Sequence, residues 1–275
     1  MNIDINQADS CYLLGYFWAD CFFGATNIEK DYYNFSFEIK TSDFIQIWPM
    51  LQHMGFEKYS TRKRKNSKNS QSCVRLYQRE QLSFFKTYNF HKKYDECTLY
   101  FSLTDEMKIY FVKGFLDGDG SISIDKNGLF RIGFNGPYHQ NWNFLEHFCN
   151  TYNIKYVIYR KERVSRHETH VKNIHKYSVF EFTNRENRLN FCEIFKDINI
   201  GLTRKFKVFE NYKNWLSSNQ KPSRIISTGI SINPKYNTFI VYSITSPQTP
   251  RTYIGTFKTL EEAITAQNNF NIQFP

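Results

Sequence analysis

The sequence predicts an α+β fold built from two similar halves of the αββαββα type, followed by a small C-terminal region of three strands and one helix. Three observations predict this duplication. Residues 12–21 and 111–120 are similar apolar runs with small residues at matching positions, and each contains an acid near its end. The order of elements predicted after the first run is predicted again after the second. In addition, residues 89–94 resemble residues 201–206.

Small residues form a track along each of the two apolar runs. Read as helices, the runs place Gly15 with Ala19, and Gly114 with Gly118, four residues apart on one helix face. A face without large side chains lets another helix backbone approach closely. We therefore expect the two helices to pack backbone against backbone through these four residues. We also expect Thr104 to cap the N-terminus of the second helix.

The acids of the two runs are Asp20 and Asp119. A carboxylate at a helix C-terminus faces the negative end of the helix dipole, which costs about 0.3–1 kcal/mol. Two such ends side by side also repel each other. A site for divalent cations would require this arrangement, because hard ions such as Mg²⁺ bind carboxylates, water and substrate phosphates. The alternative is a pair of solvated acids at two helix ends.

The two runs resemble the paired motifs of single-chain LAGLIDADG homing endonucleases. Residues 114–120, which read GFLDGDG, match the motif closely, and residues 13–21, which read LLGYFWADC, match it more loosely. The resemblance implies two halves related by a pseudo-twofold axis, in a monomer that hydrolyses both strands of double-stranded DNA with Mg²⁺ or Mn²⁺. It also implies that Asp20 and Asp119 are catalytic residues that bind the metal.

Two positions bear on how closely this chain follows the family. Cys21 stands where the family has a glycine, at a place where the chain turns out of the helix and can take positive φ. A non-glycine residue in that conformation costs about 1–2 kcal/mol, so we expect either a different turn or some strain. Asp117 has Trp18 as its counterpart in the first half, which favours a capping or structural role for Asp117.

The resemblance further implies a lysine near each active site, in the segment after the last helix of each half. By alignment of the two halves, Lys93 and Lys205 are the best matches, with Lys92 and Arg204 one residue away. Such a lysine would polarise water or offset phosphate charge. The alternative is a basic residue that packs along a helix end and contacts only the nucleic-acid backbone.

Basic residues are concentrated in the first half. The chain has a formal net charge of +10, which indicates a polyanionic partner such as nucleic acid. Residues 58–93 alone carry eleven Lys and Arg against one acid, Glu80. We expect the lysine-rich loop at residues 62–68 to bind phosphate and residues on the sheets to read bases. The alternative for each of these residues is a solvated charge without a role in binding. The candidate DNA-binding residues are Arg62, Lys63, Arg64, Lys65, Arg75, Tyr77, Gln78, Tyr159, Arg160, Arg163 and Arg166.

The C-terminal region is predicted to be a small domain. Three short strands precede a helix that starts near Thr259, where Glu262 completes a capping box. The pattern resembles the DNA-binding domain of ethylene-response transcription factors, which implies that this region contacts DNA. The predicted domains are residues 1–103 for the first half, 104–221 for the second half and 222–275 for the C-terminal domain.

Other classes of protein fit the sequence less well. The longest apolar run, residues 11–19, is far shorter than the roughly 20 residues of a membrane span. The N-terminus carries an acid and no basic residue, unlike a signal peptide. We therefore expect an intracellular protein without a membrane partner. Two alternatives remain open: an RNA-splicing maturase that acts on intron RNA, and a DNA-binding protein that has lost its catalytic activity.

Overall fold

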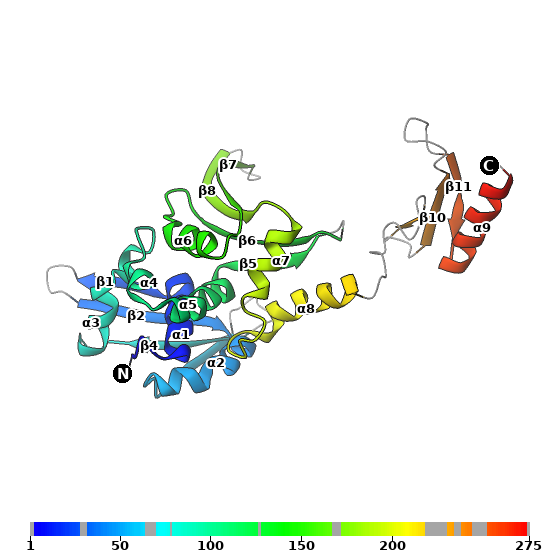
Figure 1. Ribbon diagram of the computed structural model, residues 1–275. Helices are drawn as coiled ribbons and strands as arrows, with labels where there is room; N and C mark the ends of the chain where they lie inside the picture. Colours follow the sequence, from blue (N-terminus) through cyan, green and yellow to red (C-terminus); the bar gives the residue numbers. More distant parts are fainter. Residues whose placement is uncertain are drawn as a thin grey trace. The chain divides into compact units, whose positions relative to one another are not determined.

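The chain forms two compact units. The computed structural model describes residues 3–27, 32–63, 70–77, 79–125, 128–166, 172–217, 230–233, 238–243 and 252–273. One unit consists of Met1–Ser123 with Arg131–Lys207, and the other of Ile124–Phe130 with Val208–Pro275. Helices and antiparallel strands alternate along the chain (Figure 1), which confirms the predicted α+β class.

The first half has the predicted order αββαββα. Its strands form one antiparallel sheet in the order β1-β2-β4-β3. A 3₁₀ turn η1 (Phe90–Lys92) and a short helix α4 (Thr98–Ser102) follow, and α4 buries Leu99 and Tyr100. The preceding elements are α1 (Ala8–Asp20), β1 (Phe22–Asn27), β2 (Tyr32–Lys40), α2 (Thr41–His53), β3 (Ser60–Lys63), β4 (Ser70–Leu76) and α3 (Arg79–Thr87).

The second half repeats this order. Its sheet has the strand order β5-β6-β8-β7, the same arrangement as in the first half, which confirms the duplication. The Thr104 hydroxyl accepts a hydrogen bond from the Met107 amide at 3.3 Å, so Thr104 is the predicted cap. The elements are α5 (Asp105–Gly118), β5 (Gly120–Ile124), β6 (Phe130–Pro137), α6 (Asn143–Thr151), β7 (Tyr156–Arg166), β8 (Lys172–Phe182), α7 (Arg185–Glu193) and α8 (Thr203–Ser217).

Aromatic side chains fill the core of each half. In the first half, the Phe17 ring of α1 lies 5.1 Å from the Phe35 ring and 4.9 Å from the Phe37 ring, all three buried. In the second half, Phe115 of α5 stacks on Phe134 at 5.3 Å. Each sheet therefore packs one face on a motif helix and turns the other outward. Among the described residues, no helix is long and apolar enough to cross a bilayer.

The C-terminal region contains the predicted three strands and helix. Strand β10 (Thr238–Ser243) lies between β9 (Ile230–Asn233) and β11 (Thr252–Phe257), and α9 (Leu260–Gln273) follows. Ile230, Val241 and Ala263 form its buried core. The capping box is present, because the Glu262 amide donates to the Thr259 hydroxyl and the Thr259 amide donates to the Glu262 carboxylate, both at 3.2 Å.

Candidate active site

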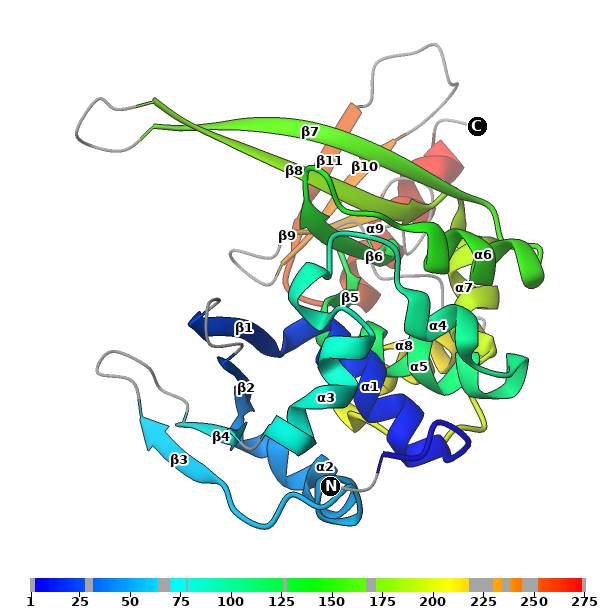
Figure 2. The same ribbon diagram turned by 90° about the vertical axis from the view of Figure 1, so that its left-hand side faces the viewer.

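Helices α1 and α5 lie side by side (Figures 1 and 2), and their backbones are in contact. A methyl group added at Gly15 would lie 1.9 Å from the Phe111 carbonyl oxygen, and one at Gly114 would lie 1.9 Å from the Tyr12 carbonyl oxygen. A methyl group on Gly118 would meet the Ala19 methyl at 2.3 Å. No larger side chain fits at Gly15 or Gly114, so the two helix ends are held close together.

Asp20 and Asp119 lie at these two ends. Asp20 is the last residue of α1, Asp119 is the residue after α5, and both side chains are exposed. A methyl group at Gly118 would lie 3.3 Å from a carboxylate oxygen of Asp20, so that carboxylate reaches across to the end of α5. The structure thus brings the two acids to one place.

The two carboxylates affect each other's protonation. The pKa of Asp119 is raised to about 6, first by partial loss of hydration and second by the neighbouring Asp20 carboxylate. Loss of hydration also raises the pKa of Asp20. Lys93 and Lys205 act in the opposite direction on both acids. A cation bound between the carboxylates would remove the repulsion that raises the pKa of Asp119.

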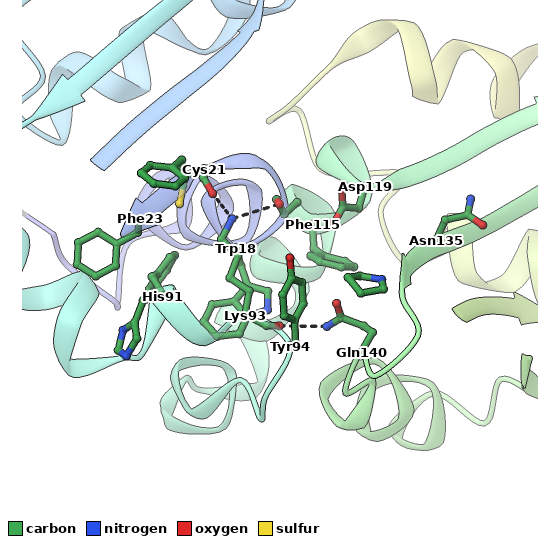
Figure 3. A pocket seen from close by; sticks show the side chains of 14 residues that line it. Trp18, Cys21, Phe23, His91, Lys93, Tyr94, Phe115, Asp119, Asn135 and Gln140 are labelled. Atoms are coloured by element: carbon green, nitrogen blue, oxygen red, sulfur yellow. Dashed lines mark hydrogen bonds between the residues drawn. The ribbon is translucent and has the colours of Figure 1, made fainter. Parts of the chain in front are cut away.

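Lys93 contacts the end of α1, as Figure 3 shows. Its ammonium group donates to the carbonyl oxygens of Ala19, at 3.2 Å, and of Cys21. These carbonyls are among those that a helix C-terminus leaves without an intrahelical partner. The positive charge also faces the negative end of the helix dipole.

Lys205 contacts the end of α5 in the same way. Its ammonium group donates to the carbonyl oxygens of Gly118 at 3.2 Å and Gly120 at 2.6 Å, the counterparts of those bound by Lys93. It also donates to the carbonyls of Leu116 and Asp117, at 2.9 and 2.6 Å. Lys205 is buried, and burial lowers its pKa to about 8. Each acid therefore has a lysine on the helix end that carries it.

Cys21 does not adopt the left-handed conformation. Its φ is −74° and its ψ is 150°, which is extended backbone, and its amide donates to the Phe17 carbonyl. The turn after α1 therefore differs from one that needs glycine, and Cys21 brings no backbone strain. In contrast, a methyl group at Gly120 would lie 2.4 Å from the Leu116 carbonyl oxygen, so the second half does require glycine.

A cleft of about 430 Å³ opens beside Asp119 and Lys93 (Figure 3). Phe22 lines it from the outward face of the first sheet, and Asn135 lines it from the second sheet. The outward faces of both sheets therefore border the cleft beside Asp119. Aromatic rings form much of the remaining wall, including those of Trp18, Phe23, Phe90, Tyr94 and Phe115.

Asp117 is buried in a polar cluster that the sequence analysis did not identify. One carboxylate oxygen accepts hydrogen bonds from the Lys113 ammonium at 2.6 Å, the Tyr12 hydroxyl at 3.0 Å and the Leu202 amide at 2.9 Å. A signal was present, because Lys113 and Asp117 are the two charged residues, four positions apart, within the otherwise uncharged stretch 109–118 of the helix. The cluster joins α1, α5 and the segment that precedes α8.

The candidate DNA-binding residues of the first half occupy different environments. Arg75 and Tyr77 are exposed, and Arg75 pairs with Ser36 on the outward face of the sheet. Lys63 is also exposed. Arg62 forms an ion pair with Glu38, with nitrogen–oxygen distances of 2.5 and 3.2 Å. Arg64, Lys65 and Gln78 lie outside the described residues.

The candidates of the second half are on β7. Tyr159 and Arg160 are both exposed at the surface. Arg160 lies opposite the buried Ser178 in the register and donates to the Tyr138 carbonyl at 3.0 Å, so its guanidinium already has a partner. Arg163 and Arg166 belong to the strand, but their side chains lie outside the described residues.

Comparisons with known proteins show partial similarity. No family model matches the chain. A protein of Methanocaldococcus jannaschii, "Uncharacterized protein MJ0314", is 25% identical over 163 residues, which cover 57% of this chain and 59% of that protein. The match thus spans less than two thirds of its relative's length.

Several solved structures resemble part of the chain. The structure of I-DmoI in complex with DNA and Ca has a TM-score of 0.49 and 16% identity, covering 74% of this chain and 97% of that one. A lysine-to-alanine mutant of I-SmaMI has a TM-score of 0.49 and 13% identity, covering 76% and 92%. The I-SmaMI LAGLIDADG homing endonuclease bound to cleaved DNA has a TM-score of 0.46 and 15% identity, covering 75% and 87%.

Proposed function

We propose that this chain is a metal-dependent endonuclease that cleaves both strands of duplex DNA at a specific site. One observation carries the proposal: two carboxylates meet at the ends of two helices in backbone contact, and each helix end is bound by a lysine. The arrangement repeats in both halves, as expected for a site that treats two DNA strands alike. The motifs in residues 13–21 and 114–120 support the same reading.

The donor set fits a hard divalent cation. Among the described residues, no group of three or more His, Cys, Asp and Glu side chains could hold a metal, so Asp20 and Asp119 would share the ligands with water and substrate phosphate. Mg²⁺ accepts such a site, and we propose Mg²⁺ as the natural ion and Mn²⁺ as a substitute. The ions would activate water and neutralise charge on the phosphate and the leaving oxygen.

The two lysines would act next to the acids. Their positive charges lie at the helix ends, where they would offset the charge of a scissile phosphate or polarise a water molecule. Lys205, whose pKa is lowered to about 8, has a larger neutral fraction near neutral pH than an ordinary lysine. We assign Lys93 to the first half's site and Lys205 to the second half's site.

The outward faces of the two sheets would bind the DNA. They border the cleft at Asp119. Arg75 on β4 and Tyr77, the residue after β4, are exposed and would approach a groove from the first sheet. The basic residues between 58 and 93 would bind phosphate. Because one chain contains both halves, a monomer would suffice. The C-terminal region, which exposes Tyr253, is proposed as a further DNA contact.

Cleavage selection tests the proposal without knowledge of the target. The protein is incubated with a randomised duplex DNA library and Mg²⁺, and cut molecules are recovered and sequenced. The selected duplex is then used with Asp20→Asn and Asp119→Asn. We expect each substitution to abolish cleavage and leave binding largely intact. Asp105→Asn, which removes an exposed ion pair with Lys108 at the other end of α5, is the matched control.

Cleavage at the normal rate by either active-site variant would refute the role of that acid. Binding without cleavage by the wild-type protein would favour a DNA-binding protein that has lost activity. Tighter binding of structured intron RNA than of duplex DNA would favour a maturase that acts on intron RNA.

A further inference from the structure

The segment before Lys205 is fixed at three consecutive residues. The Leu202 amide donates to Asp117 of the same half, as described above. The Thr203 amide and hydroxyl donate to the Gln46 side-chain oxygen at 3.2 and 3.0 Å. Arg204 binds Asp43. Gln46 and Asp43 belong to α2, so the start of α8 is attached to the first half of the chain.

The contact between Arg204 and Asp43 is the strongest of these. The Arg204 Nε lies 3.0 and 2.9 Å from the two oxygens of Asp43, and a terminal nitrogen lies 2.8 Å from one of them. The Asp43 side chain is almost fully buried. A paired guanidinium and carboxylate in this geometry restrict orientation as well as distance. Lys205 is the next residue along the helix.

The segment that contains Lys93, in the first half, is attached to the second half. The Gln140 side-chain amide donates to the Lys93 carbonyl at 3.1 Å, and the Asn141 amide donates to the Tyr94 carbonyl at 2.9 Å. Gln140 is buried and belongs to the second half, just before α6. Since α6 is the counterpart of α2, each lysine segment is attached to the other half at equivalent places.

We propose that Asp43 is a positioning residue for Lys205 and that Gln140 is a positioning residue for Lys93. Each half would then hold the lysine of the other half in position. This inference rests on the proposed function for its catalytic meaning. The Lys205 ammonium must stay within 3.2 Å of four carbonyls. A displacement of about 1 Å would break hydrogen bonds of this kind and can reduce a catalytic rate by about a hundredfold.

Lysine labelling tests the positioning without DNA or metal. The full chain is acetylated briefly, digested with chymotrypsin and analysed by mass spectrometry; Phe206 separates Lys205 from the exposed Lys207, which serves as reference. We expect Asp43→Asn to increase labelling of Lys205 by roughly tenfold or more, because a hydrogen bond to a charged group shifts local opening by at least that factor. Lys93 and the buried Lys113 should be unchanged.

Gln140→Met is the matched variant for the other half. It should increase labelling of Lys93 relative to the adjacent exposed Lys92 and leave Lys205 protected. The inference is wrong if Asp43→Asn leaves Lys205 protected, or if Lys205, Lys93 and Lys113 all become reactive together, which would indicate general loosening of the fold.

Cleavage of individual strands gives the functional test. The selected duplex carries a different fluorophore on each strand, and single-turnover rates are measured for each. Lys205→Met and Lys93→Met first identify the strand that depends on each lysine. We expect Asp43→Asn to slow the Lys205 strand by about tenfold or more, so that nicked DNA accumulates, and Gln140→Met to slow the other strand. Equal slowing of both strands would overturn the inference, whereas a wild-type protein that cuts neither strand would refute only the proposed function.

Discussion

The Lys113 ammonium lies 2.6 Å from a carboxylate oxygen of Asp117, and both side chains are buried almost completely. Breaking a buried ion pair by removing one partner leaves an uncompensated charge, which typically costs about 3–5 kcal/mol. We therefore expect Lys113→Met and Asp117→Asn each to lower the free energy of unfolding by about that amount, as measured by urea denaturation. The double variant with Lys113→Met and Asp117→Asn should lose less than the two single losses together. Single losses below about 1 kcal/mol would show that the pair contributes little.

The contact between α1 and α5 predicts a large effect for a small substitution. Gly15→Ala would place a methyl group 1.9 Å from a backbone oxygen that cannot move alone. We expect a loss of at least about 3 kcal/mol in the free energy of unfolding. Gly24→Ala is the control, since its methyl would meet only the exposed Phe22 ring, at 2.8 Å, which can turn away. Similar losses for both variants would contradict the close approach of the two helices.

Cys21 and Gly120, the residues after the two acids, predict losses of stability of different size when each is substituted. Cys21 is extended and buried, so Cys21→Gly should reduce stability by about 1 kcal/mol and leave cleavage no faster. Gly120→Ala should be more destabilising, because its methyl would collide with the Leu116 carbonyl. Thermal unfolding and single-turnover cleavage measure both effects. A large gain in cleavage for Cys21→Gly would mean that the turn after α1 impairs the native site.

The raised pKa of Asp119 predicts how stability depends on pH. An acid with a pKa of about 6 when folded and 3.8 when unfolded holds its proton more tightly in the folded state, so it lowers stability as pH rises through this interval. Without added metal, Asp119→Asn should therefore raise the melting temperature at pH 8. The gain should disappear below about pH 4, where both states are protonated. Melting curves from about pH 3 to pH 8 test this, and a gain that is independent of pH would contradict it.

The sequence by itself determined the duplicated architecture and the helices that carry the acids. Apolar periodicity and the small residues Gly15 and Gly114 are local signals, because each depends on residues close together in the chain. The duplication follows from finding the same local signals twice. The capping residues Thr104 and Thr259 were predictable for the same reason. The extended conformation of Cys21 was not, since the motif alone left two conformations open.

Only the tertiary structure decided what surrounds the two lysines. Lys205 reaches carbonyls 85 to 89 residues away, and Arg204 reaches Asp43 over a separation of 161 residues. The partners of such long flexible side chains cannot be predicted from the sequence, because they depend on which backbone segments the fold brings together. The helix pair that the motifs specify leaves carbonyl oxygens at its C-terminal ends without an intrahelical partner. Tertiary packing then decides which lysines reach these carbonyls.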